Sequence, residues 1–166
     1  MKECDLAKGQ ITVKLTVERL VVTKSDDEGS GNNADVDGID VWIKAFNAPD
    51  KDGKEGNLVS KQPEHVYGTN AFHWDGYKTV GKGHVFTTKG TFEVLVFNDV
   101  DNDFDWARIE LTMWHKEDDP VSDDYATGTA IIYGKSFFDN DSQHSFTVTG
   151  SDLGIRCEYS IELYDF

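Results

Sequence analysis

Long apolar runs, cysteine, proline and positive charge are all scarce in this chain of 166 residues. No stretch approaches the roughly 18 consecutive apolar residues of a membrane-spanning helix, so we expect no transmembrane segment. The 16 lysines and arginines face 31 aspartates and glutamates, which leaves a formal net charge of -15. A surface this acidic repels nucleic acid, which we therefore exclude as a partner. The 3 prolines fall outside every run of strand-forming residues.

The sequence also lacks the short motifs that mark common catalytic sites. It has no G-x-S-x-G elbow, no H-E-x-x-H motif and no glycine-rich loop of the phosphate-binding kind. Paired carboxylates serve glycosidases, but a chain with this many acids brings some pairs together by chance. We therefore expect that the protein is not an enzyme.

The 2 cysteines bear on compartment. Cys4 precedes the first predicted strand and Cys157 lies in the last one. The terminal strands of a sandwich often lie side by side, so a Cys4–Cys157 disulfide and two separate thiols are both open. A disulfide would imply an oxidising compartment. The first ten residues show no hydrophobic region of the signal-peptide kind. We expect an extracellular or secreted protein whose leader is absent from this sequence, with a cytoplasmic, membrane-peripheral location as the alternative.

Strand patterns dominate the chain and predict a single all-β domain over residues 1–166. The runs are rich in β-branched and aromatic residues, are separated by Gly, Asn, Asp and Ser, and cover residues 11–22, 39–46, 91–97, 107–114, 125–133, 144–149 and 154–164. Residues 48–89 are the least regular part, and one or two further strands belong there. The pattern predicts an antiparallel β-sandwich of eight strands, with a range of seven to nine.

Acidic side chains gather between the predicted strands. The segment WHKEDDPVSDDYATG (residues 114–128) carries five carboxylates, and NADVDGID (residues 33–40) carries three. Successive loops of an up-and-down sandwich alternate between its two ends, so the two segments share an end if residues 48–89 contribute an odd number of strands. Crowded like charges are relieved by solvation, by a basic partner or by a cation. Ca²⁺, which takes six to eight oxygen ligands from irregular loops, suits such an end better than Zn²⁺.

Three stretches resemble a C2 domain, the calcium-dependent membrane-docking β-sandwich. ITVKLTVERLVV looks like the family's opening strand, and GIDVWIKAF is similar to its SDPYVKV segment, with Asp40 at the aspartate. The stretch from FEVLVF to DDYATG has the layout FxFxV…LxIxVxDxD…DDxxG, with His115 and Glu117 in place of the aspartates of DxD. The resemblance implies one Ca²⁺ held by acids of both segments. Its implied ligands are Asp35, Asp37, Asp40, Glu117, Asp118, Asp123 and Asp124.

Aromatic residues support a second interpretation. Trp74 and Tyr77 lie in the glycine-flanked stretch FHWDGY, and Trp106 follows an aspartate run. Exposed rings stack on sugars, so these three residues are candidate ligands of a carbohydrate-binding or adhesion module with a structural calcium. Trp42 and Trp114 lie inside strands, and we expect them in the core.

Our main hypothesis from the sequence is therefore a calcium-binding, C2-like module that docks on a phospholipid surface through acidic loops at one end. The alternatives are the carbohydrate-binding or adhesion module and an extracellular, acidic structural protein.

Overall fold

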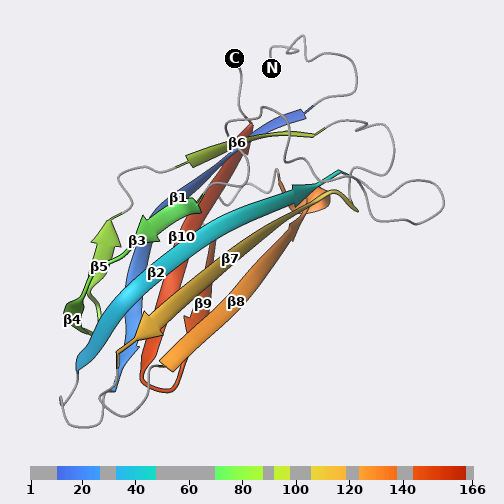
Figure 1. The fold of residues 1–166 in the computed structure, drawn as a ribbon. Helices are drawn as coiled ribbons and strands as arrows, with labels where there is room; N and C mark the ends of the chain where they lie inside the picture. The colour runs from blue at the N-terminus through green and yellow to red at the C-terminus, as the bar shows by residue number, and fades with distance from the viewer. Residues whose placement is uncertain are drawn as a thin grey trace.

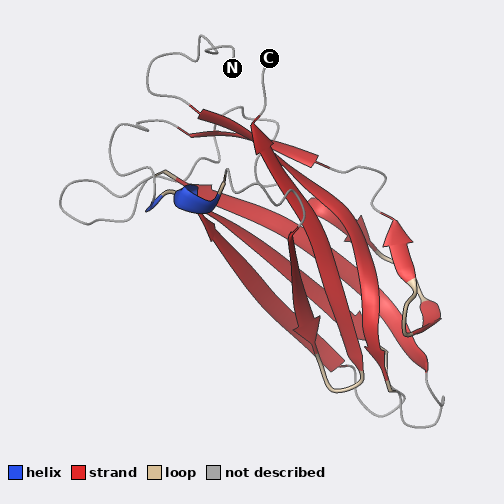
Figure 2. Cartoon of the chain, turned by 180° about the vertical axis from the view of Figure 1, so that it is seen from behind, coloured by secondary structure: helices blue, strands red, loops and turns tan. Residues whose placement is uncertain are grey.

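Strands make up nearly all of the regular structure in the computed structural model, which describes residues 11–26, 33–47, 70–87, 92–97, 106–118, 124–137 and 144–163. The strands are β1 (Ile11–Ser25), β2 (Asn33–Phe46), β3 (Asn70–Trp74), β4 (Lys78–Gly81), β5 (Val85–Thr87), β6 (Phe92–Phe97), β7 (Arg108–Glu117), β8 (Asp124–Tyr133), β9 (His144–Thr149) and β10 (Leu153–Leu163). A 3₁₀ turn at Gly134–Ser136, blue in Figure 2, follows β8. No helix within these ranges has the length and apolar character needed to cross a bilayer.

The strands form two antiparallel sheets that face each other (Figure 1). One sheet has the order β5–β1–β10–β9, with β6 also paired to β1. The other has the order β3–β2–β7–β8, with β4 also paired to β2. Because β10 occupies one edge of β1, β5 and β6 lie one after the other along its opposite edge. In the same way β3 and β4 share the edge of β2 that β7 leaves open.

Each of these two interrupted pairs fills one strand position, so the sandwich has four positions in each sheet and eight in all. The predicted all-β, antiparallel, eight-stranded sandwich is confirmed. The irregular region 48–89 supplies the single β3/β4 position and the β5 segment of the next one. Between β1 and β7 the chain therefore crosses the sandwich three times, through β2, β3/β4 and β5/β6. The chain after β1 and the chain after β7 thus reach the same end of the sandwich, the lower end in Figure 1.

Alternation along the strands places the core between the sheets. In β7 every second residue is buried, and Ile109, Leu111 and Met113 belong to the hydrophobic core cluster. On the edge strand β8 the inward positions carry small residues, among them Ala126 and Gly128. A Cβ on Gly128 would lie 2.7 Å from Val148 Cγ2 of β9. The missing side chain therefore lets the edges of the two sheets close together.

The same alternation corrects one expectation about the core. Trp42 and Trp114 alternate with buried neighbours in β2 and β7, so both rings lie on the outer face of their sheet and are only partly buried. The Trp114 ring packs against the exposed ring of Tyr125, with 5.8 Å between the ring centroids.

The Cys4–Cys157 disulfide is not formed, because Cys157 is a free, buried thiol. Strands β1 and β10 are indeed neighbours, but their register places Cys157 opposite Leu20, in the middle of β1. Ile11, where β1 begins, is nine residues or about 30 Å from that point along the strand. Seven residues of fully extended chain span at most about 25 Å, so a disulfide to residue 4 would require nearly full extension of the segment before Ile11. Cys4 itself lies outside the described residues.

Candidate metal centre

Two polar side chains continue the buried face of β7 beyond its apolar residues. His115 and Glu117 occupy the last two inward positions of the strand, where they are 2% and 1% exposed. A buried carboxylate is costly unless it is paired, protonated or bound to a cation. The end of β7 is therefore the first place to look for a site that uses Glu117.

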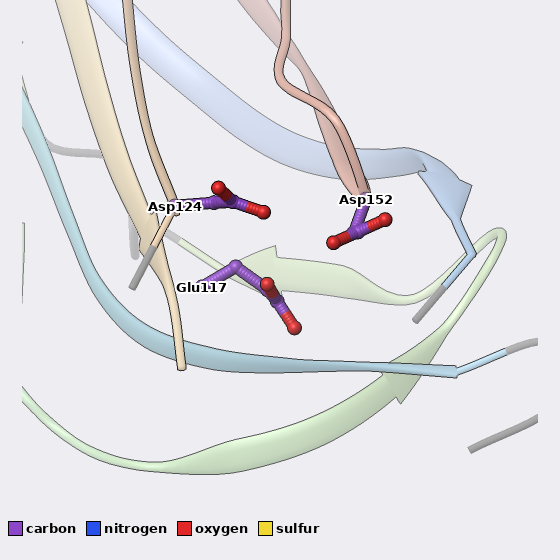
Figure 3. A group of neighbouring side chains, drawn as sticks. All are labelled: Glu117, Asp124 and Asp152. Atoms are coloured by element: carbon purple, nitrogen blue, oxygen red, sulfur yellow. The ribbon is translucent and has the colours of Figure 1, made fainter. Parts of the chain in front are cut away.

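Glu117 lies beside two further carboxylates, those of Asp124 and Asp152. One oxygen of each residue can be chosen so that all three atoms lie within 4.8 Å of one another. Figure 3 shows the three carboxylates pointing toward a common space. Asp124 and Asp152 are partly buried, so this space lies at the rim of the sandwich.

Backbone pairing brings these three residues together from both sheets. Glu117 and Asp124 are direct partners in the β7–β8 ladder. Asp152 belongs to the turn between β9 and β10, which is closed by a bond from Gly150 N to Leu153 O of 2.8 Å. The carbonyl oxygen of Asp152 accepts a bond from Asp26 N at 2.9 Å, which joins this turn to the end of β1. The cluster thus joins the open edges of the two sheets.

His115 lies next to the cluster and lines the same small space as Glu117 and Asp124. Its Nε2 lies 2.9 Å from the carbonyl oxygen of Val148 on β9. A carbonyl can only accept, so Nε2 carries the proton and donates it. Burial lowers the pKa of His115, while the hydrogen bond to Val148 raises it to a lesser extent. The imidazole is therefore favoured in its neutral form, and its role here is to hold β9 against β7.

The structure separates the residues that the sequence assigned to the metal. Glu117 and Asp124 meet in the cluster. Asp35, Asp37 and Asp40 lie within β2, in positions that alternate with buried residues, and so face outward. Asp35 accepts a hydrogen bond from Thr79 Oγ1 at 2.5 Å, and Asp37 forms an ion pair of 2.9 Å with Lys116.

The two acidic segments nevertheless meet through their backbones. Val36 pairs with Glu117, and Asp118 N donates to Asp35 O at 2.8 Å. Asp118 follows β7 directly and is partly buried, whereas Asp123 lies outside the described residues. The predicted convergence at one end is present, but the side chains of β2 are on the other face of their sheet.

Sequence reasoning missed Asp152, the third member of the cluster. A single acid in the short turn TGSDLG gives no charge run. Successive loops lie at opposite ends of the sandwich, and this rule predicts the position of Asp152. The β9–β10 turn lies two strands after the β7–β8 loop and so returns to the same end.

The aromatic residues proposed for a sugar platform do not form one. Trp74 packs against the core, with its ring 5.2 Å from that of Phe86. Tyr77 and Trp106 are 60% and 53% exposed. Tyr77 lies directly before Lys78, which pairs with Val36 of β2. Trp106 lies two residues before Arg108, which pairs with Phe46 of β2. Ten residues of β2 separate these partners, or about 33 Å, so the two exposed rings cannot stack on one sugar.

Comparisons with known proteins add no assignment to this geometry. No model of a protein family matches the chain, and searches of curated proteins and of solved structures find no significant match.

Proposed function

We propose that the protein binds one Ca²⁺ through Glu117, Asp124 and Asp152. The observation that supports this proposal is the convergence of three carboxylates, one of them only 1% exposed, within 4.8 Å. Their mutual repulsion is large at this spacing, and a divalent cation removes it for all three at once. The lowering of repulsion is then part of the binding free energy.

The donor set favours Ca²⁺ over other common metals. Three carboxylates supply up to six oxygen atoms, which suits a hard cation with six to eight ligands. Zn²⁺ prefers cysteine and histidine, and the nearby His115 uses its Nε2 for Val148. Carboxylates placed on two strands and a turn also tolerate the irregular geometry that Ca²⁺ accepts more readily than Mg²⁺.

We propose further that the bound ion docks the module on an anionic phospholipid surface. The cluster lies at the end of the sandwich, and the partial exposure of Asp124 and Asp152 leaves room for oxygen ligands from outside the protein. Binding of one Ca²⁺ lowers the charge of the three carboxylates from -3 to -1, so the repulsion of phosphate falls, and a phosphate oxygen can join the ligands of the ion itself. An extracellular location is part of this proposal, but the free thiol of Cys157 lends it no support.

Calorimetric titration with Ca²⁺ tests the ion site. We expect one ion per chain for the wild type and no binding for Glu117→Gln. Glu162→Gln is the matched control, because this side chain is 61% exposed and pairs with Lys14 on the outer face. Equal binding by all three proteins would refute the assignment. Sedimentation with vesicles of phosphatidylcholine and phosphatidylglycerol, in Ca²⁺ and in EGTA, then tests docking separately.

A further inference from the structure

A second cavity lies at the same end of the sandwich, between the end of β1 and the turn that joins β4 to β5. It has a volume of about 290 Å³ and is lined by Thr23, Lys24, Ser25, Asp26 and Lys82. Thr23, Lys24 and Ser25 end β1, and Asp26 follows it. Lys82 belongs to the turn between β4 and β5, at the lower left of Figure 1. This lining is distinct from the carboxylates of the metal cluster.

The backbone beside this cavity contains a β-bulge. The register of β1 against β10 shifts between Val22 and Lys24, which makes Thr23 the extra residue of a bulge. Bulges redirect side chains and recur beside binding sites. Gly154 faces the bulge, and a Cβ there would lie 2.9 Å from Thr23 Oγ1 and 3.1 Å from Lys24 Cβ. The glycine therefore leaves space for the Thr23 side chain, and Thr23 lines the cavity.

The charge of this cavity is opposite to that of the molecule. Two lysines meet in it, although the chain carries a formal net charge of -15. Within the described ranges neither Lys24 nor Lys82 forms an ion pair. Asp26 lines the cavity as well, so the described lining residues carry two ammonium groups and one carboxylate, a net charge of one positive unit. The hydroxyl group of Thr23 adds hydrogen-bonding capacity.

We propose that this cavity binds a phosphate diester. A diester carries one negative charge, which matches the excess of one ammonium group, and its oxygen atoms accept hydrogen bonds from lysine and hydroxyl donors. A monoester carries up to two negative charges at neutral pH and is repelled more strongly by Asp26. A phospholipid headgroup and a soluble glycerophosphodiester both present this chemistry.

Titration of the ¹⁵N-labelled protein with glycerophosphoglycerol in EGTA tests the cavity without calcium. We expect shifts of the Thr23, Lys24 and Lys82 amide signals, and binding weaker by roughly tenfold or more in Lys24→Gln/Lys82→Gln. Lys44→Gln is the control for replacement of an exposed lysine elsewhere, since Lys44 is exposed on β2 of the other sheet; it removes one charge, against two in the double variant. Absence of shifts at millimolar ligand, or equal binding by the double variant, would overturn the proposal.

A second arm identifies the source of the phosphate and keeps the two proposals apart. Phosphatidylglycerol vesicles in Ca²⁺ should retain the wild type and Lys44→Gln more strongly than the double variant if the ligand is a lipid. Equal retention, with the soluble diester still bound, would assign the cavity to a free phosphodiester. Calcium titration of the double variant should be unchanged, because neither lysine belongs to the metal cluster. The two sites can therefore fail independently, and absence of calcium binding would not exclude the phosphodiester site.

Discussion

Replacing Glu117 by glutamine should change thermal stability in opposite directions with and without calcium. Without the ion, Glu117→Gln removes the most buried of three neighbouring carboxylates and keeps the shape of the side chain. Repulsion within the cluster falls, so the variant should melt at a higher temperature than the wild type in EGTA. With calcium, the wild type should gain stability and the variant should gain little, because one of its ligands has lost its charge.

The spacing of the cluster sets the size of the first effect. Two unit charges at the 4.8 Å that bounds these atoms repel by about 0.9 kcal/mol in water and by about 3.5 kcal/mol at an effective dielectric constant of about 20. Glu117 interacts with two such charges, so its removal relieves about 2 kcal/mol even at the lower bound. Counter-ions reduce this value, and we expect an increase in Tm of roughly 2–5 °C in EGTA.

Mass action sets the size of the second effect. An ion that binds only the folded protein contributes about 2.7 kcal/mol at a free concentration of about 100 times its Kd. For a chain of this length that corresponds to an increase in Tm of roughly 5–10 °C for the wild type. Differential scanning calorimetry of both proteins, in EGTA and in calcium, gives the four values needed.

The control variant is Glu162→Gln, whose exposed ion pair with Lys14 contributes little. Its Tm should stay within about 1 °C of the wild type in EGTA, and its calcium shift should be complete. The reasoning would be refuted if Glu117→Gln melted below the wild type in EGTA and kept the whole calcium shift. Glu117 would then be neither repelled by its neighbours nor a ligand.

Three further predictions concern the interior and the edge of the sandwich. Burial raises the pKa of the Cys157 thiol to about 12, so iodoacetamide at pH 8 should modify this thiol only in urea. Peptide mass mapping measures the modification, and a modified Cys157 in the folded protein would contradict its burial. Burial lowers the pKa of His115, so the unfolded chain takes up its proton first, near pH 6.5, and the free energy of unfolding should fall below that pH. Urea titrations in EGTA at pH 7.5 and 5.5 should show a smaller decrease for His115→Gln than for the wild type, and equal decreases would exclude His115 as the cause. Gly128→Ala should destabilise the protein by roughly 1–3 kcal/mol, because the new methyl group meets Val148. Adding Val148→Ala should restore part of the lost stability. If the edges of the two sheets can separate freely, neither effect will be seen.

Strand periodicity was sufficient to predict the architecture. The alternation of β7 and β8 shows in the sequence, and it places both acidic segments at one end once a single strand position is assigned to residues 48–89. The β2 strand begins at Asn33, six residues before its apolar run. Asp35 and Asp37 have low strand propensity, and pairing with β4 and β7 overrides that propensity. Local composition therefore indicated a loop where the structure has a strand.

The site could be predicted only in part, because it depends on which face each side chain occupies. Glu117 and Asp124 were found from the acid-rich loop, but the inward direction of Glu117 follows from its place in the alternation of β7. Asp152 arrives from a turn that is distant in sequence and has no charge run. The sequence left the Cys4–Cys157 disulfide open for a similar reason, since it indicates that the terminal strands are neighbours but not their register. Register and facing direction are set by tertiary packing, which composition does not encode.

A crystal structure determined in calcium would show directly which residues hold the ion. We expect one ion bound by Glu117, Asp124 and Asp152, with oxygen ligands at about 2.3–2.6 Å. An ion bound only by other residues, or well-ordered carboxylates of these three with no ion between them at millimolar calcium, would contradict it.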